Sequence, residues 1–162
     1  MSAFTCLLGE PALSDFRKRK LLRRITAATG SQAELEACFV YLVESGEVLD
    51  DAEISALQEL LHGHPATEHE ADNSLIVVPR LGTLSPWSTK ATDIARRCGL
   101  TNVMRIERGT VYQASGVDEA HHDTVAALLH DRMTQSVLNS LEQARDLFVH
   151  ARPGPLVHVP VE

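Results

Sequence analysis

The triplet Leu60-Leu61-His62 recurs as Leu128-Leu129-His130, 68 positions further along the chain. Each copy falls within a segment with helical spacing of apolar residues. The residues ahead of the two segments also match: Gly46 and Asp50 before the first, and Gly116 and Asp118 before the second. A match at the same place in two series of elements indicates that the chain contains two similar halves.

The residues around the first triplet predict four elements in the order strand, helix, strand and helix. Strand formers predict strands at 4–8 and 35–44, and a helix between them begins near Ser14 and ends at Gly30. Asp50 or Asp51 is expected to cap the second helix. The stretch 62–73 is polar and contains glycine and proline, which is typical of a linker.

The second half repeats this order. Its predicted elements are a strand at 74–80, a helix capped by Ser88 or Thr89 and ended by Gly99, and a strand at 103–114 bent at Gly109. A last helix is predicted to begin at Asp118 and to continue to about Val149, either unbroken or with one break. The last residues, 152–162, contain three prolines and predict an extended tail.

Two strands are too few to bury two amphipathic helices, so we expect the halves to share one sheet. The predicted fold is α/β in the broad sense, an α+β sandwich with a four-stranded, mainly antiparallel sheet and helices on one face. It forms a single duplicated domain over 1–150, with halves at about 1–68 and 69–150 and a tail at 151–162.

Composition limits the classes of partner. The chain has 162 residues, a net charge of −7 and 4% aromatic residues, which argues against a basic or base-stacking surface for nucleic acid. Its apolar runs are short of the ~20 residues that cross a bilayer, and its N-terminus lacks the pattern of a signal peptide. We therefore expect a cytoplasmic protein with neither a nucleic-acid nor a membrane partner.

The ionisable residues suggest no active site. The three cysteines, Cys6, Cys38 and Cys98, are far apart in sequence and are expected to be buried thiols of a reduced protein. The eight histidines lack the spacing of a metal site and are expected on the surface. Glu107-Arg108 and Asp131-Arg132 are expected to form local ion pairs. We predict no catalytic, cofactor-binding or metal-binding residue in this chain.

The segment from Arg80 to Lys90 joins a predicted strand to the start of a helix. A helix N-terminus presents free N–H groups, and Arg80, Ser88, Thr89 and Lys90 could add donors to an anion such as phosphate. The spacing differs from that of a phosphate-binding glycine-rich loop. A capped helix start, with Trp87 packed on a neighbour or docked to another protein surface, is the alternative interpretation.

Five runs of sequence carry a family resemblance. They are the stretch from Val78 to Ala95 (VPRLGTLSPWSTKATDIA) with Cys98-Gly99-Leu100 and Arg105-Ile106-Glu107-Arg108-Gly109, the early Pro11-Ala12-Leu13-Ser14-Asp15-Phe16-Arg17, and Leu129-His130-Asp131-Arg132-Met133-Thr134. In collinear order over nearly the whole chain, they resemble the N-terminal domain of the large, single-chain phosphoribosylformylglycinamidine synthase, also called formylglycinamide ribonucleotide (FGAR) amidotransferase.

The resemblance implies a fold like a fused pair of the small accessory subunit of multi-subunit versions. It also implies a parent ligase of purine biosynthesis that uses ATP and Mg²⁺. That enzyme hydrolyses glutamine in a glutaminase domain and passes ammonia to the ATP-activated amide of FGAR, giving the amidine FGAM. The catalytic residues of the family lie beyond the length of this chain, so none is carried over, and we expect the chain to be a piece of that enzyme, inactive by itself.

A structural and docking role is therefore expected, holding the synthetase and glutaminase domains in register and helping to seal the ammonia path. The candidate docking residues, chosen by resemblance and chemistry, are Arg80, Trp87, Ser88, Lys90, Asp93, Arg105 and Arg108. The alternatives left open are a sensor of phosphorylated metabolites or nucleotides and, as the weakest, an autonomous enzyme. An exposed docking face is also expected to allow self-association of the isolated domain.

Overall fold

A computed structural model describes residues 2–67 and 74–149, and a six-stranded antiparallel sheet forms its centre. The spatial order is β3-β1-β2-β5-β4-β6. The strands are β1 (Ala3–Pro11), β2 (Glu34–Ser45), β3 (His64–Pro65), β4 (Leu75–Pro79), β5 (Val103–Ser115) and β6 (Gln135–Leu138). The predicted α+β class and antiparallel sheet are confirmed, but the predicted number of four strands is wrong.

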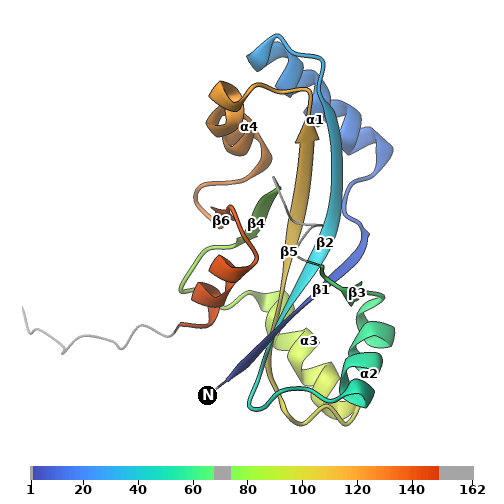
Figure 1. Cartoon of the computed structure of the whole chain (residues 1–162). Coiled ribbons are helices and arrows are strands. Elements are labelled where there is room, and N and C mark those ends of the chain that lie inside the picture. Colours follow the sequence, from blue (N-terminus) through green and yellow to red (C-terminus); the bar gives the residue numbers. More distant parts are fainter. Residues whose placement is uncertain (1, 68–73, 150–162) are drawn as a thin grey trace, which may run out of the picture.

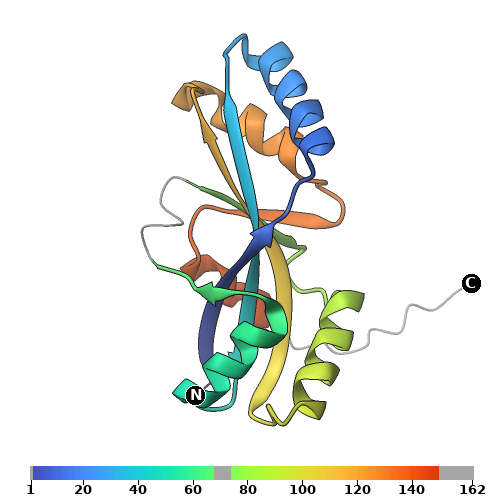
Figure 2. The same ribbon diagram turned by 90° about the vertical axis from the view of Figure 1, so that its right-hand side faces the viewer.

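Four α-helices pack on one face of this sheet, in two pairs. They are α1 (Asp15–Thr29), α2 (Asp51–Leu61), α3 (Pro86–Arg97) and α4 (His122–Leu129). Figure 1 shows α1 and α4 at one end of the long strands and α2 and α3 at the other, and Figure 2 shows the same division from the side. In the first pair, α1 follows β1 and α4 follows β5 in the chain. In the second pair, α2 follows β2 and α3 follows β4. The division of the chain into duplicated halves at about residue 68 stays a prediction.

The two longest strands, β2 and β5, pair along their whole length at the middle of the sheet, from Glu34 opposite Ser115 to Ser45 opposite Val103. Gly109 of β5 lies opposite Val40 in this register. A Cβ atom at Gly109 would lie 2.7 Å from the carbonyl oxygen of Val77 and 3.0 Å from Cγ1 of Val78. The glycine is therefore required by the close approach of β4.

Capping residues begin the helices close to their predicted positions, with one correction. Ser14 and Asp50 cap α1 and α2 as expected. The cap of α3 is Ser85, whose Oγ accepts a hydrogen bond from the backbone N–H of Ser88 at 3.0 Å; the predicted caps Ser88 and Thr89 lie inside the helix. Pro86 explains the earlier start, because proline suits the first helical position, where its missing N–H costs nothing.

The predicted last helix is the main error in the sequence analysis. A short 3-10 helix, η2 (Glu119–His121), precedes α4, which ends at Leu129 rather than near Val149. The strand β6 and a second 3-10 helix, η3 (Glu142–Phe148), follow. The helical spacing of the apolar residues is overridden here because Val137 pairs with Val77 in the sheet, where burial on β4 stabilises an extended chain.

The other added strand, β3, is short, and both of its residues, His64 and Pro65, are exposed. β3 falls in the stretch predicted as a linker and pairs with β1 at Leu7 and Leu8. The rest of that predicted linker, 68–73, and the predicted tail, 152–162, lie outside the described residues.

On the sheet face opposite the α-helices, η3 covers the centre. Ala144, Leu147 and Phe148 of η3 pack in one cluster with Val40 and Leu42 of β2. The ring of Phe148 meets that of Phe4 edge to face, with centroids 5.7 Å apart. The second face is thus covered at its centre, and η3 brings the last described residues against β5.

The close contact at Gly109 gives a stability prediction. Gly109→Ala should lower the free energy of unfolding by about 1–3 kcal/mol, because backbone of β4 must move to admit the methyl group. Urea denaturation followed by circular dichroism measures the loss. Gly46→Ala is the matched control: its added Cβ meets the end of the Asn102 side chain at 3.1 Å, so a much smaller loss is expected. Equal losses would show that the approach of β4 is not the constraint.

Candidate docking surface

A buried ion pair lies at the centre of the candidate residues. Arg105 and Glu107 are two positions apart on β5 and therefore point to the same face of the sheet, the one that carries η3. Arg105 Nη2 lies 2.6 Å from Glu107 Oε1, and the side chains are 10% and 0% exposed. Such a pair requires further hydrogen bonds to offset the loss of water from both charges.

The guanidinium group of Arg105 supplies those bonds to two other segments. Nη1 donates to the carbonyl oxygen of Leu147 at 2.9 Å, and Nη2 donates to that of Thr83 at 2.7 Å. The group also lies over the ring of Phe148, 5.2 Å from its centroid. Arg105 thus joins β5 to the end of η3 and to the loop between β4 and α3.

Glu107 forms a third connection, to the start of α3. Its Oε2 accepts a hydrogen bond from Ser85 Oγ at 2.7 Å, and its Oε1 accepts one from the Ser85 backbone N–H at 3.3 Å. The anion expected at this helix start is therefore the carboxylate of the chain itself. A phosphate at the same place would have to displace Glu107, so the geometry gives the sensor hypothesis no support there.

Arg80 connects the same loop to the turn after α4. Its backbone N–H donates to the carbonyl oxygen of Thr134 at 3.0 Å, and its Nη1 donates to that of Met133 at 3.4 Å. One residue on, the N–H of Leu81 donates to Ser136 Oγ at 3.3 Å. The loop 80–85 is consequently hydrogen-bonded to the 131–136 segment through Arg80, and it is connected to η3 through Arg105.

These three connected segments present large apolar side chains to solvent. The residues are Leu81, Leu84, Met133 and Val149, with exposed fractions of 39%, 60%, 75% and 64%. We call them the apolar rim. Exposed large apolar side chains on neighbouring segments suit the binding of another protein surface, and the hydrogen bonds described above connect the segments that carry these four. The sequence analysis identified Arg80 and Arg105 but missed the rim, whose residues come from segments far apart in the chain.

Two other predicted residues lie together on a second surface. Trp87 and Lys90 of α3 line a groove of about 330 Å³ with Ala91, Ile94 and the α2 residues Leu60 and Leu61.

The side chain of Arg108 stands between two rings beside this groove, 4.9 Å from the centroid of Trp87 and 4.7 Å from that of Phe39. Trp87 also stacks on Tyr41, with centroids 5.9 Å apart. Arg108 is thus held by aromatic faces, and Glu107 pairs with Arg105 instead of the expected Arg108.

The remaining candidates are placed differently. Ser88 is fully buried in α3, so it lies inside the domain and not on its surface. Asp93 is exposed and pairs with Arg97 at 3.4 Å. Arg105 is also buried, so it holds the loop from within. A docking role of the exposed residues Arg80, Lys90, Asp93 and Arg108 stays a prediction.

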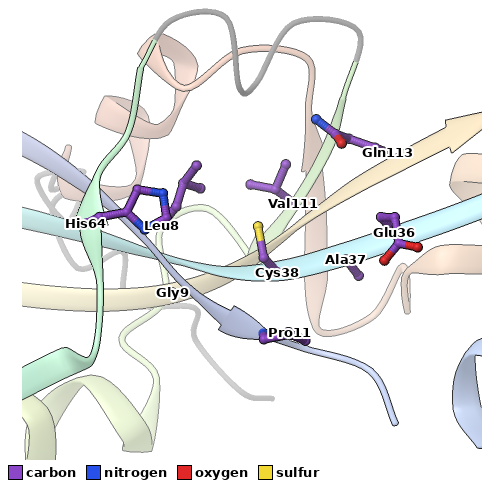
Figure 3. Close-up of a pocket in the computed structure, with 9 residues that line it drawn as sticks. All are labelled: Leu8, Gly9, Pro11, Glu36, Ala37, Cys38, His64, Val111 and Gln113. Atoms are coloured by element: carbon purple, nitrogen blue, oxygen red, sulfur yellow. The ribbon is translucent and has the colours of Figure 1, made fainter. Parts of the chain in front are cut away.

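A hollow of about 320 Å³ lies on the other side of the sheet from the α-helices (Figure 3). Four strands line it with the residues Leu8, Gly9, Pro11, Glu36, Ala37, Cys38, His64, Val111 and Gln113. The predicted docking residues are all absent from this set. Among residues 2–67 and 74–149, no group of three His, Cys, Asp or Glu side chains is arranged to hold a metal ion.

The cysteines depart in part from the prediction of buried thiols. Cys6 and Cys38 are half-buried, and Cys98 is exposed at the end of α3. Burial raises the pKa of the Cys6 thiol to about 12, and the positive charge of Arg145 lowers it by less. Of the expected surface histidines, His62, His64 and His122 are exposed, whereas His121 and His130 are half-buried. His69, His150 and His158 lie outside the described residues.

These features define the class of protein as a small α+β domain. Its buried polar groups connect its own segments, and its exposed apolar side chains lie on segments that hydrogen bonds fix in place. Residues 38–148 match the family model described as formylglycinamide ribonucleotide amidotransferase N-terminal. The match covers more than half of the chain, so the chain belongs to this family, which is part of an enzyme of purine biosynthesis.

Within the described part, no helix has the length and apolar character to cross a membrane.

The buried pair gives a second prediction. Glu107→Gln should lower the free energy of unfolding by about 3 kcal/mol, because it leaves the Arg105 charge buried without its counter-charge. Asp93→Asn removes an exposed carboxylate whose pair with Arg97 should contribute less than about 1 kcal/mol, and it serves as control. Urea denaturation measures both variants. A loss for Glu107→Gln as small as that of the control would contradict the assigned role.

Cys6 gives a prediction on pH. The thiol has a reference pKa of 9.0 and a folded pKa of about 12, so its contribution to stability is complete below pH 9 and is lost as the pH rises toward 12. Between these values the free energy of unfolding should fall by about 1.4 kcal/mol per pH unit from this group. Cys6→Ala should reduce the slope of stability against pH by that amount. Urea denaturation at a series of pH values tests this, and identical slopes would refute it.

Proposed function

We propose that this chain is the structural and docking domain of a glutamine- and ATP-dependent phosphoribosylformylglycinamidine synthase. In this role it holds the synthetase and glutaminase domains in register and helps to seal the path of ammonia between them. Membership of the family supports the parent enzyme. The docking role is supported by the apolar rim, and the chemistry of the parent enzyme resides in its other domains.

The observation that carries the proposal is the exposure of three large apolar side chains on three connected segments. Arg105 joins the loop 80–85 to η3, and Arg80 joins that loop to the segment 131–136. Leu84, Met133 and Val149 are each at least 60% exposed. Covering a side chain of this size stabilises a complex by about 1.5–3 kcal/mol. The hydrogen bonds already hold the backbone of each segment, so docking orders little additional chain and loses less entropy.

The groove between α2 and α3 supplies a second contact of different chemistry. Its lining is apolar apart from Lys90, so it suits an apolar side chain with an acidic neighbour. The face of Trp87 is already covered by Arg108 and Tyr41, which keeps the indole in one orientation. We assign the rim as the primary surface because three of its side chains are at least 60% exposed, whereas Leu60, Leu61 and Trp87 of the groove are half-buried. The groove is its accessory.

Arg105 is a positioning residue in this scheme. It is too deeply buried to reach a partner, but it determines where Thr83 and Leu147 lie and hence where Leu84 and Val149 are presented. Replacing it should weaken docking indirectly. Replacing a rim residue should weaken docking without unfolding the domain, and this difference separates the two roles.

A complementation experiment tests the proposal. The domain and the remainder of the enzyme, expressed separately, should associate and restore formation of FGAM from FGAR, glutamine and ATP. The double variant Leu84→Glu with Met133→Glu should weaken association at least tenfold, because two carboxylates would enter an apolar contact. Calorimetry measures association, and the ratio of glutamine hydrolysed to FGAM formed measures sealing of the ammonia path.

Met104→Glu is the matched control, since Met104 is 50% exposed but lies on β5 away from the rim. It should leave association and the ratio unchanged. Failure of the unaltered domain to associate with the remainder would contradict the docking role. Binding of a purine nucleotide or of FGAR to the domain alone, lost in Arg80→Ala and Lys90→Ala, would favour the sensor alternative instead.

A further inference from the structure

Helix α1 carries a charge opposite to that of the chain as a whole. Of the 15 Lys and Arg residues in the chain, six lie in this helix, against one carboxylate at Asp15. They are Arg17, Lys18, Arg19, Lys20, Arg23 and Arg24. The net charge of the whole chain is −7, so this concentration of cations is local. The helix lies outside residues 38–148, which match the family model.

The outer face of α1 combines these cations with an aromatic ring. Ile25 is the fully buried residue of the helix, and a helix turns by about 100° per residue. Phe16, Lys20 and Arg23 therefore lie on the side opposite Ile25, with Arg19 beside them. Phe16 is 71% exposed, and the three cations are exposed as well. We call Phe16, Arg19, Lys20 and Arg23 the cationic face.

The described residues do not neutralise this face. Lys18, which lies on the same side of the helix as Ile25, pairs with Glu36, and Arg19 Nε donates to the carbonyl oxygen of Asp15 within the helix. Lys20 and Arg23 make no ion pair with a carboxylate in the described ranges. The neighbouring α4 region carries Glu119 and Asp123, which moderate the field without pairing to these cations.

An acidic loop at the far end of β2 is complementary to this face. Glu47, Asp50 and Asp51 are exposed between β2 and α2, and Val48 among them is 84% exposed. The two arginines in the last turn of α3 are engaged elsewhere. Arg96 donates to the carbonyl oxygens of Val103 and Met104, and Arg97 pairs with Asp93. Like the cationic face, the loop combines unpaired charge with one large exposed apolar side chain.

The two surfaces of one molecule cannot meet. α1 precedes β2 and the acidic loop follows it, and the 12 residues of this strand span about 40 Å at ~3.3 Å per residue. Figure 1 shows α1 and the start of α2 at opposite ends of the molecule. We propose that the cationic face of one copy binds the acidic loop of a second copy, with Phe16 against Val48. This head-to-tail contact leaves one surface free on each copy, so association continues beyond a dimer.

Paired charge-reversal variants test this on the intact protein. Lys20→Glu with Arg23→Glu makes both surfaces acidic, and Glu47→Lys with Asp51→Lys makes both basic. These positions avoid Asp50, whose side chain caps α2. Sedimentation velocity at low salt should show concentration-dependent association of the unaltered protein and at least tenfold weaker self-association of each variant. About 0.5 M salt should abolish association, because it screens charges beyond a few Å.

The mixture of the two variants is the decisive sample. The acidic α1 of one is complementary to the basic loop of the other, so mixing should restore association to within a few-fold of the unaltered level. Circular dichroism confirms that each variant is folded. Absence of association in the unaltered protein at low salt, or failure of the mixture to associate, would overturn the proposal.

Further samples exclude other occupants of the cationic face. Binding of a single-stranded RNA oligonucleotide or of anionic lipid vesicles by α1, with no self-association, would also overturn the proposal. Leu84→Glu with Met133→Glu leaves both surfaces intact and should associate normally. The self-association experiment therefore gives its result whether or not the proposed docking role of the rim is correct.

Discussion

The ion pair between Arg105 and Glu107 organises the surface of this domain. Removing two charges from water is costly, and here the cost is offset by bonds to Leu147, Thr83 and Ser85. Leu147 belongs to η3, Thr83 lies in the loop 80–85, and Ser85 ends that loop as the N-cap of α3. The pair therefore determines how the loop before α3, the start of α3 and the end of η3 lie relative to β5. The main effect of the ion pair is to fix one geometry of these segments. It adds little net stability, since an apolar pair of similar volume can be as stable.

The exposed apolar rim depends on that geometry. The carbonyl groups of Thr83 and Leu147 accept hydrogen bonds from the guanidinium group of Arg105. These bonds fix the backbone beside Leu84 and Val149 and so determine where the two rim side chains lie. The long antiparallel pairing of β2 with β5 has a separate effect. It places the two helix pairs, and with them the basic α1 and the acidic loop, at opposite ends of the sheet. The rim and the charged ends are therefore independent surfaces.

Local signals in the sequence predicted most of the architecture. The caps Ser14 and Asp50, the central strands and the order of elements are confirmed because each depends on residues close together in the chain. Family membership followed from the long run between Val78 and Ala95 with its neighbours, and residues 38–148 confirm it. The wrong predictions arose where a distant partner decided the outcome. Val137 has helical spacing but pairs with Val77, and Glu107 is next to Arg108 but turns to Arg105.

The α+β class, the antiparallel sheet, the family and the concentration of cations in α1 could all be recognised from the sequence. Periodicity, capping and composition act over a few residues and can be recognised without coordinates. Tertiary structure alone decided the two added strands, the burial of Arg105 and the assembly of the rim. These depend on contacts between residues such as Arg105 and Leu147, 42 positions apart, whose burial and hydrogen bonding no local pattern encodes.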